Sequence, residues 1–207
     1  MQKIEPLSLL ILAGGRATRM QEQDKGLVVF NKKPLVTHLI DRFAPKVSSV
    51  FISCNRNFDE YQQFGYPLLP DQQSDFAGPL AGIEVGLAEC PTPYLMVMPC
   101  DMPQLPADLI EKLWAPINEQ SQNGENSTVN LITVAEDDER LQVLVMILPR
   151  ECLGSIRGYL AEGKRSVYGW LNTQQIREVN FPGEQSGFAN INTLTELADQ
   201  ERSSPTE

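Results

Sequence analysis

The chain has 207 residues, of which 42% are hydrophobic and 21% charged, and its formal net charge is −10. This composition fits one globular domain, which we predict to span residues 1–198, with residues 199–207 as a flexible tail. The negative charge argues against nucleic-acid binding, and no apolar run approaches the ~20 residues of a membrane span. The N-terminus has no signal-peptide pattern, so we expect a cytoplasmic protein that does not contact a membrane.

Cysteine and histidine usage excludes several classes of site. The chain has one histidine, and its four cysteines lie far apart without a C-x-x-C pair: Cys54, Cys90, Cys100 and Cys152. This spacing disfavours a zinc site and a disulfide scaffold, so we expect reduced and mostly buried thiols. His38 follows Pro34 on a predicted amphipathic helix, where we expect it to pack. A hydrolase built on a histidine base is therefore set aside.

Strand-like and helix-like segments alternate from the first residues onward. Apolar runs predict strands over residues 7–12, 49–53, 67–70, 94–99, 129–135 and 143–148. Apolar residues at helical spacing predict helices over residues 35–43, 80–87, 109–117 and 153–160, and a capping box, Thr193-x-x-Glu196, opens a last one. Residues 120–127 are predicted to form a surface loop and residues 136–139 an exposed turn. The order predicts an α/β fold, a mostly parallel doubly wound sheet with helices on both faces.

The first predicted strand runs directly into Gly14-Gly15, which is followed by Arg16, Arg19 and Lys25. Glycine lets backbone N–H groups turn toward an oxyanion, and the cations stand where a polyphosphate needs them. Residues 1–46 hold eight Lys/Arg against four Asp/Glu, although the whole chain is acidic. Neither the P-loop nor the dinucleotide-binding spacing is present. We interpret the segment as a loop for a nucleoside triphosphate, and a plain strand-to-helix turn is the alternative.

Further polar residues follow later strands or precede helices. Asp101 follows the strand over residues 94–99, at the sheet edge where ligands bind in such folds, and could hold Mg²⁺. As an alternative, Asp101 could form a cap or a turn. Asp71 follows the strand over residues 67–70, and Gly78-Pro79-Leu80-Ala81-Gly82 begins a helix that could approach a nucleotide. Asn190 and Asn192 could contact a ligand or cap the last helix.

Together these motifs resemble the molybdenum cofactor guanylyltransferase family. The family signature is close to LAGG-x-x-x-RM-x-x-x-DKGL, which here runs from Leu12 to Leu27. The remaining matches follow in order at familiar spacing: Lys33-Pro34-Leu35, Asn55-Arg56, Asp71, Gly78 to Gly82, Pro99-Cys100-Asp101 and Asn190 to Thr193. The resemblance extends over residues 7–198. Ser53 stands where the family often has an asparagine near the nucleotide, so either Asn55 makes that contact or the contact is lost.

The resemblance implies a Rossmann-like nucleotidyltransferase fold with a mixed-topology edge. It also implies transfer of GMP from GTP to the phosphate of molybdopterin, with release of pyrophosphate. The implied catalytic residues are Arg19, Lys25 and Asp101, of which Asp101 would bind Mg²⁺. The implied GTP-binding residues are Leu12, Ala13, Gly14, Gly15, Lys25, Asp71 and Asp101, and the pterin would be bound by Asn190 and Asn192. Implied transient partners are other cofactor-biosynthesis proteins, molybdoenzymes or their chaperones.

Two other functions stay open at this point. Base choice depends on a few hydrogen bonds, so a nucleotidyltransferase of the same fold could use CTP or ATP instead of GTP. A non-catalytic carrier of a nucleotide or pterin would belong to a different class. The presence of both Lys25 and Asp101 speaks against a carrier, because carrying needs no metal–phosphate chemistry.

Overall fold

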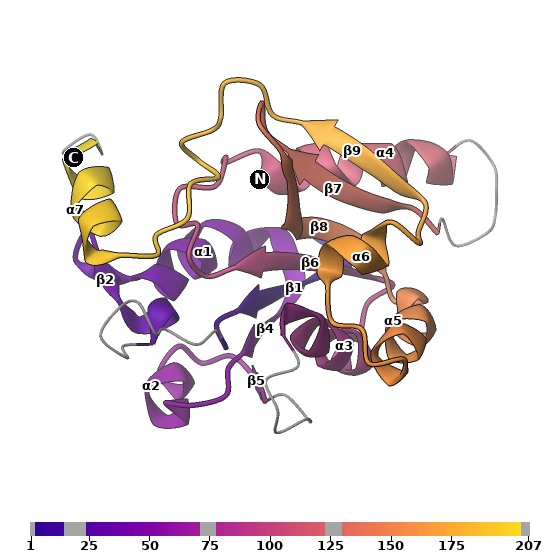
Figure 1. Ribbon diagram of the computed structural model, residues 1–207, viewed down its shortest axis with the longest axis horizontal. Helices are drawn as coiled ribbons and strands as arrows, with labels where there is room; N and C mark the ends of the chain where they lie inside the picture. The colour runs from indigo at the N-terminus through magenta and orange to yellow at the C-terminus, as the bar shows by residue number, and fades with distance from the viewer. Residues whose placement is uncertain (1–2, 15–23, 71–77, 123–129, 204–207) are drawn as a thin grey trace.

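The computed structural model describes residues 3–14, 24–70, 78–122 and 130–203 of the chain. A central seven-stranded sheet has the order β5-β4-β1-β6-β8-β7-β9 (Figure 1). Its strands are β1 (Ile4–Leu12), β4 (Val47–Ser53), β5 (Leu68–Leu69), β6 (Tyr94–Pro99), β7 (Ile132–Glu136), β8 (Leu141–Pro149) and β9 (Ile176–Asn180). Strands β5, β4, β1 and β6 pair in parallel, whereas β8 runs antiparallel to both β6 and β7. The prediction of a mostly parallel sheet is confirmed.

Helices cover both faces of this sheet because successive side chains of a strand point to opposite faces. In β1, Leu7, Leu9 and Ile11 belong to one hydrophobic core, and Leu10 belongs to the other. Helices α1 (Leu35–Phe43) and α4 (Leu109–Gln122) contribute to the first core. Helices α3 (Pro79–Glu89), α5 (Cys152–Ala161) and α6 (Val167–Leu171) contribute to the second.

The strand order reverses its direction of growth at β1. The chain adds β4 and β5 on one side of β1, and then β6 on the other side. Helix α1 precedes β4 and packs on one face, whereas α3 precedes β6 and packs on the opposite face. Such a switch point leaves a crevice beyond the carboxyl ends of the two strands, where ligands bind in open α/β sheets.

Smaller elements complete the edge at which β1 and β6 end. They are the turn η1 (Lys25–Leu27), the hairpin β2 (Val29–Phe30) and β3 (Lys33–Pro34), and the helices α2 (Phe58–Gln62) and α7 (Leu194–Ser203). The turn η2 (Ala44–Lys46) lies at the opposite edge, directly before β4 begins. The predicted capping box opens α7, since Thr193 Oγ1 accepts from the Glu196 N–H and Glu196 accepts from the Thr193 N–H. Buried Ile191, just before α7, packs with residues of the β2–β3 region in a third, small core.

The structure differs from the sequence predictions at several places. Strand β9 was not predicted, and β7 begins at Ile132 instead of residue 129. Helix α4 continues to Gln122, into the predicted surface loop, and α7 continues to Ser203, past the predicted domain end at residue 198. The predicted exposed turn over residues 136–139 is wrong in part: Glu136 ends β7, and Asp137 is buried. Strand β9 and the C-terminal ends of α4 and α7 carry polar residues that a hydrophobicity pattern assigns to loops.

The predicted burial of the thiols and the predicted packing of His38 are confirmed. All four cysteines are free and buried. His38 contacts Phe30 edge to face, and its Nε2 lies 2.8 Å from the Phe30 carbonyl oxygen. In the part of the chain that the structure describes, no helix combines the length and the apolar character needed to cross a membrane.

Candidate active site at the ends of β1 and β6

The ends of three parallel strands bring the signature segments together. Leu12, the last residue of β1, lies opposite Pro99 of β6 and Ser53 of β4. Beyond the strands, the Cys100 N–H donates to the Leu12 carbonyl at 3.0 Å, and the Ala13 N–H donates to the Ser53 carbonyl at 2.8 Å. Ala13-Gly14 and Cys100-Asp101 therefore leave the sheet side by side. The predicted adjacency of the glycine loop and Asp101 is confirmed.

Gly14 is closely approached by the segment that follows β4. A Cβ atom at Gly14 would lie 2.9 Å from Nδ2 of Asn55, too close for a real contact. Ser53 is itself buried in the sheet and meets the loop through its main-chain carbonyl. Asn55 is thus the polar side chain that this segment brings against the glycine loop.

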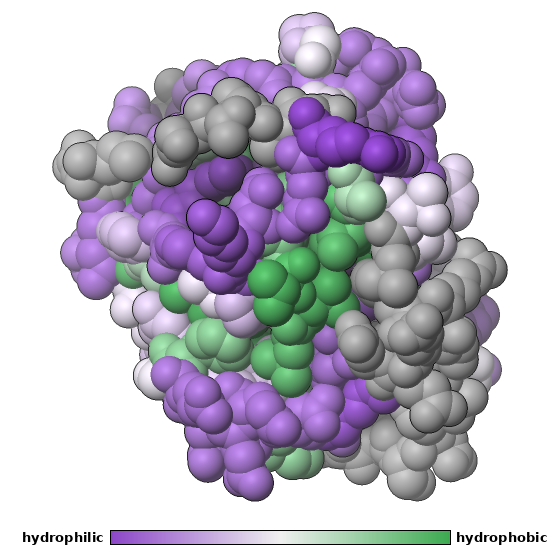
Figure 2. Space-filling model, turned by 90° about the vertical axis from the view of Figure 1, so that its left-hand side faces the viewer, coloured by the Kyte–Doolittle hydropathy of each residue, from purple (hydrophilic) through white to green (hydrophobic). Residues whose placement is uncertain are grey.

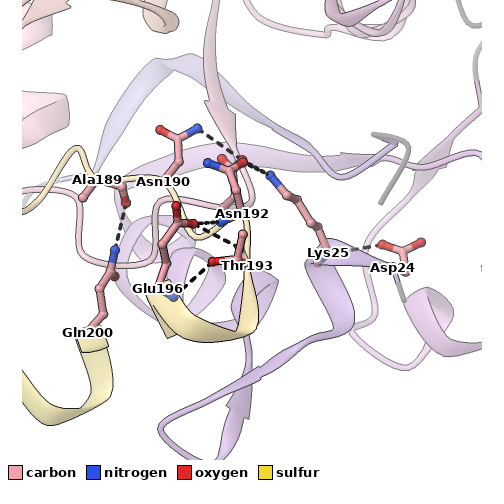
Figure 3. Close-up of polar contacts among 10 residues, drawn as sticks. Asp24, Lys25, Ala189, Asn190, Asn192, Thr193, Glu196 and Gln200 are labelled. Atoms are coloured by element: carbon pink, nitrogen blue, oxygen red, sulfur yellow. Dashed lines mark hydrogen bonds and ion pairs between the residues drawn. The ribbon is translucent and has the colours of Figure 1, made fainter. Parts of the chain in front are cut away.

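A polar cluster joins three chain segments at this edge (Figure 3). Lys25 Nζ lies 2.7 Å from Asp101 Oδ2 and donates to Asn192 Oδ1 at 2.6 Å. Asn190 Nδ2 donates to the same Asp101 oxygen at 3.3 Å, and the Ile191 N–H donates to the Asp101 carbonyl at 2.9 Å. Four predicted site residues from positions 25, 101, 190 and 192 therefore share one hydrogen-bonded group.

Two oxygen atoms of this cluster lack a hydrogen-bond partner among the described residues. They are Asp101 Oδ1 and Asn190 Oδ1, and both are buried. Buried acceptors are normally satisfied, because an unpaired one costs about 1–3 kcal/mol. A hard cation with phosphate and water ligands would satisfy Asp101 Oδ1, since Mg²⁺ commonly takes one or two carboxylates and fills its shell with phosphate and water. The donor set fits such an ion, although no cluster of three or more His, Cys, Asp or Glu suited to a metal occurs among the described residues.

Asp24 forms a second buried polar group that the sequence interpretation missed. Its carboxylate accepts from Tyr61 Oη at 2.6 Å, Arg56 Nε at 3.3 Å and Asn57 Nδ2 at 3.2 Å. Asp24 stands in the signature motif, and its place there could have indicated a role for it. The sequence around Tyr61 contains no feature that marks Tyr61 as the hydrogen-bond partner of Asp24. Asn57 adopts a φ of 54°, a conformation that asparagine tolerates better than most residues.

Two cysteines and one tyrosine near these two carboxylates have raised pKa values. Burial, followed by the neighbouring Asp101 and Asp24, raises the pKa of the Cys100 thiol well above its usual value. Burial, with a smaller contribution from Asp24, raises the pKa of Cys54 to about 12. Burial, the nearby Cys100 and Asp24 likewise raise the pKa of the Tyr61 hydroxyl. Neither thiol is therefore a nucleophile at neutral pH, and Tyr61 is a hydrogen-bond donor.

Three predicted site residues, Gly15, Arg19 and Asp71, lie outside the described residues. The face at which β1 and β6 end is turned to the viewer in Figure 2, where hydrophobic residues gather in a central patch with hydrophilic residues above it, below it and to its left. Ligand sites commonly combine an apolar floor with a few placed polar groups.

Comparison with known proteins places this geometry in a family. Residues 9–178 match the model of the MobA-like NTP transferase domain. A molybdenum cofactor guanylyltransferase of Cupriavidus necator is 40% identical, covering 93% of this chain and 94% of its own. A protein of the same name from Shewanella loihica is 36% identical, covering 90% and 91%.

Solved structures agree on the fold. Molybdopterin-guanine dinucleotide biosynthesis protein A of Archaeoglobus fulgidus aligns with a TM-score of 0.71 and 19% identity, over 95% of this chain and 97% of that one. A CMP:2-keto-3-deoxy-manno-octonic acid synthetase aligns with a TM-score of 0.69 and 12% identity, over 96% and 97%. The chain therefore has a nucleotidyltransferase fold, and it belongs to the molybdenum cofactor guanylyltransferase family of MobA-like NTP transferases.

Proposed function

We propose that this protein transfers GMP from GTP to the phosphate of molybdopterin, forming the guanine dinucleotide cofactor and releasing pyrophosphate. The names of its relatives support the substrates. The observation that carries the proposal for this chain is the contact of Lys25 with Asp101 at the switch point of the sheet. This pair sets a cation and an incompletely satisfied carboxylate at the place where a triphosphate and its metal would meet.

The roles of the residues follow from charge and position. Lys25, together with Arg19, would neutralise the charge that builds on the leaving pyrophosphate. Backbone N–H groups near Gly14 and Gly15 would hold the phosphates, and Leu12, Ala13 and Asp71 would contact the nucleotide. Asp101 would hold Mg²⁺, which when bound would neutralise phosphate charge.

The acceptor needs little activation from the protein. Its attacking phosphate oxygen is already an anion, so catalysis consists mainly of aligning it with the α-phosphorus of GTP for in-line displacement. Asn190 and Asn192 are our proposed contacts to the pterin substrate. The unpartnered Oδ1 of Asn190 supports this role, since it is a buried acceptor next to Asp101.

The cellular setting belongs to the same proposal. Free thiols at all four cysteines suit a reducing compartment, which supports the cytoplasm. The partners that we propose beyond the two substrates are other cofactor-biosynthesis proteins, molybdoenzymes or their chaperones, met transiently on delivery of the product.

The experiment that tests the function is pyrophosphate release with Mg²⁺ and each of GTP, CTP and ATP, with and without molybdopterin. We expect release with GTP and only when the acceptor is present. Release with CTP or ATP in place of GTP would keep the chemistry and refute the base preference. Tight GTP binding without release under any condition would refute the enzyme and favour a carrier.

A further inference from the structure

Asp24 is a buried carboxylate for which the proposed reaction has no direct use. Its side chain is only 2% exposed. It directly precedes Lys25, yet the two side chains point away from one another in Figure 3. Burying an ionised carboxylate costs free energy unless it is paired and hydrogen-bonded, so the contacts of Asp24 show what its burial achieves.

Four donors saturate this carboxylate, and they come from separate parts of the fold. Oδ1 accepts from Tyr61 Oη of α2 at 2.6 Å and from the Gly26 N–H of η1 at 3.3 Å. Oδ2 accepts from Arg56 Nε at 3.3 Å and from Asn57 Nδ2 at 3.2 Å, both in the segment between β4 and α2. Asp24 therefore ties the turn that bears Lys25 to the neighbouring segment of the sheet edge.

The main chain around Lys25 is held by the hydrogen bond from the Gly26 N–H to the Asp24 carboxylate and by two main-chain hydrogen bonds of η1. Asp24 is the N-cap of η1, and its carbonyl accepts from the Leu27 N–H at 3.0 Å. The carbonyl of Lys25 accepts from the Val28 N–H at 3.1 Å. With its backbone held in this way, the flexible lysine side chain begins from a set position and reaches Asp101 Oδ2 at 2.7 Å.

Asp24 and Asp101 differ in whether a carboxylate oxygen remains available to bind a further group. Asp101 keeps one buried oxygen without a partner among the described residues. Both oxygens of Asp24 already accept two hydrogen bonds each, and they face Tyr61 and Arg56 instead of Lys25 Nζ. A metal ligand needs open lone pairs, so the geometry excludes Asp24 as a second metal carboxylate and leaves it a structural link to Lys25.

We propose that Asp24 is a positioning residue that acts on the nucleotide phosphates through Lys25, without touching them. The inference rests on the proposed function only in that Lys25 binds a nucleotide phosphate. Asp24 holds the Lys25 main chain, and Tyr61 holds Asp24.

A double-mutant cycle between Asp24→Asn and Lys25→Ala tests this link, with nucleotide affinity measured by calorimetry in Mg²⁺. The Asp24→Asn side chain replaces one carboxylate oxygen with an NH2 group, which can only donate. In one orientation this NH2 group faces the Gly26 N–H, and in the other it faces Arg56 and Asn57, so at least one hydrogen bond is lost in either case. We expect Asp24→Asn to weaken GTP binding about tenfold when Lys25 is present, and less than about twofold when Lys25 is Ala. Equal weakening in both backgrounds, or no weakening in either, would overturn the proposal.

A second variant and a control guard against a loss of folding. Tyr61→Phe keeps the ring and removes the 2.6 Å donor to Asp24, so we expect a roughly threefold weakening that also disappears in Lys25→Ala. Asp137→Asn neutralises another buried carboxylate, whose donors all lie within residues 139–142. It should lower the thermal unfolding midpoint while leaving GTP affinity unchanged. A similar loss of GTP affinity in Asp137→Asn would show that Asp24 acts through stability alone.

The wild-type protein is first titrated with GTP, CTP and ATP, and the cycle is then run with the nucleotide that binds. Preference for CTP or ATP would refute the proposed base, and the cycle would still decide the role of Asp24. Absence of binding to all three nucleotides would overturn both the proposed function and this inference.

Discussion

Asp101 follows β6 and Asp137 follows β7, so these two carboxylates leave the sheet along the same edge. Both oxygens of Asp137 have partners: Oδ1 accepts from the Glu139 and Arg140 N–H groups at 2.9 and 2.8 Å, and Oδ2 accepts from Gln142 Nε2 at 2.7 Å. Asp101 pairs with Lys25 through one oxygen and keeps the other buried without a partner among the described residues. The first arrangement stabilises a turn, whereas the second leaves binding capacity at a cost in stability.

The largest expected effect is the loss of pyrophosphate release when Asp101 is replaced. Asp101→Asn removes the charge that faces Lys25 and the oxygen that would bind Mg²⁺, so we expect pyrophosphate release to fall by at least about 100-fold. GTP affinity should change far less, because Lys25 and the glycine loop remain. Steady-state release and calorimetry measure the two quantities.

Asp137→Asn is the matched control for this experiment, because it replaces a carboxylate of similar burial at the same sheet edge. Its turnover should stay within about twofold of wild type, since its hydrogen bonds serve only its own turn. Turnover by Asp101→Asn at the wild-type rate would refute the metal assignment.

The strands of the sheet differ in how well the sequence could predict them. Strands β1 and β6 contain continuous apolar runs, and each ends in a recognisable motif. Strand β6 was predicted to the residue and the end of β1 was predicted correctly, but β1 begins at Ile4, three residues before the predicted start. Strand β9 has a half-exposed pattern with Arg177 and Glu178 exposed, and no apolar run marks it. The antiparallel direction of β8 depends on which strands pair, and an apolar run reads the same in either direction.

The site was predictable where one short motif holds the residue. Lys25 and Asp101 each stand in such a motif, and the sheet-edge rule correctly brought them together. The support of Asp24 was not predictable, because Tyr61 lies 37 residues away and resembles an ordinary core aromatic. Residues that hold a site depend on the tertiary fold, so they show only when the segments are packed.

Crowding at individual glycines offers a further comparison, between Gly26 beside the site and Gly154 on the surface of α5. A Cβ at Gly26 would lie 2.4 Å from Tyr61 Oη and 3.3 Å from the Ala13 Cβ. We expect Gly26→Ala to lower the free energy of unfolding by about 1–3 kcal/mol, as overpacked sites do. Urea unfolding followed by circular dichroism measures this change.

Gly154 is the matched control for overpacking, because it lies exposed within α5 and a Cβ there meets nothing within 4 Å. Gly154→Ala should raise the free energy of unfolding by about 0.5–1 kcal/mol, since alanine loses less backbone entropy in a helix. If Gly26→Ala and Gly154→Ala both lowered the free energy of unfolding, or both raised it, crowding at Gly26 would not explain the effect of the added Cβ.

The smallest expected effect is a pH dependence of the stability that Asp137 contributes. Burial raises the pKa of Asp137, but hydrogen bonds from the Arg140 and Glu139 N–H groups and from Gln142 outweigh it and leave that pKa below 3.8. A lowered folded pKa means that the charge stabilises the fold above the unfolded value and that this contribution disappears as the pH falls through the folded value. The stability difference between wild type and Asp137→Asn should therefore be constant from pH 7 to about 5 and shrink below about pH 4.

Urea titrations of both proteins from pH 7 to 3 measure that difference. If it is the same at pH 3 as at pH 7, the charge of Asp137 contributes nothing and its turn is held by geometry alone. If it shrinks as expected, the ionised carboxylate stabilises the turn through the donors from residues 139–142. Asp101 has no such set of backbone donors on its carboxylate in the described structure, so its charge remains available to Lys25 and to a bound ion.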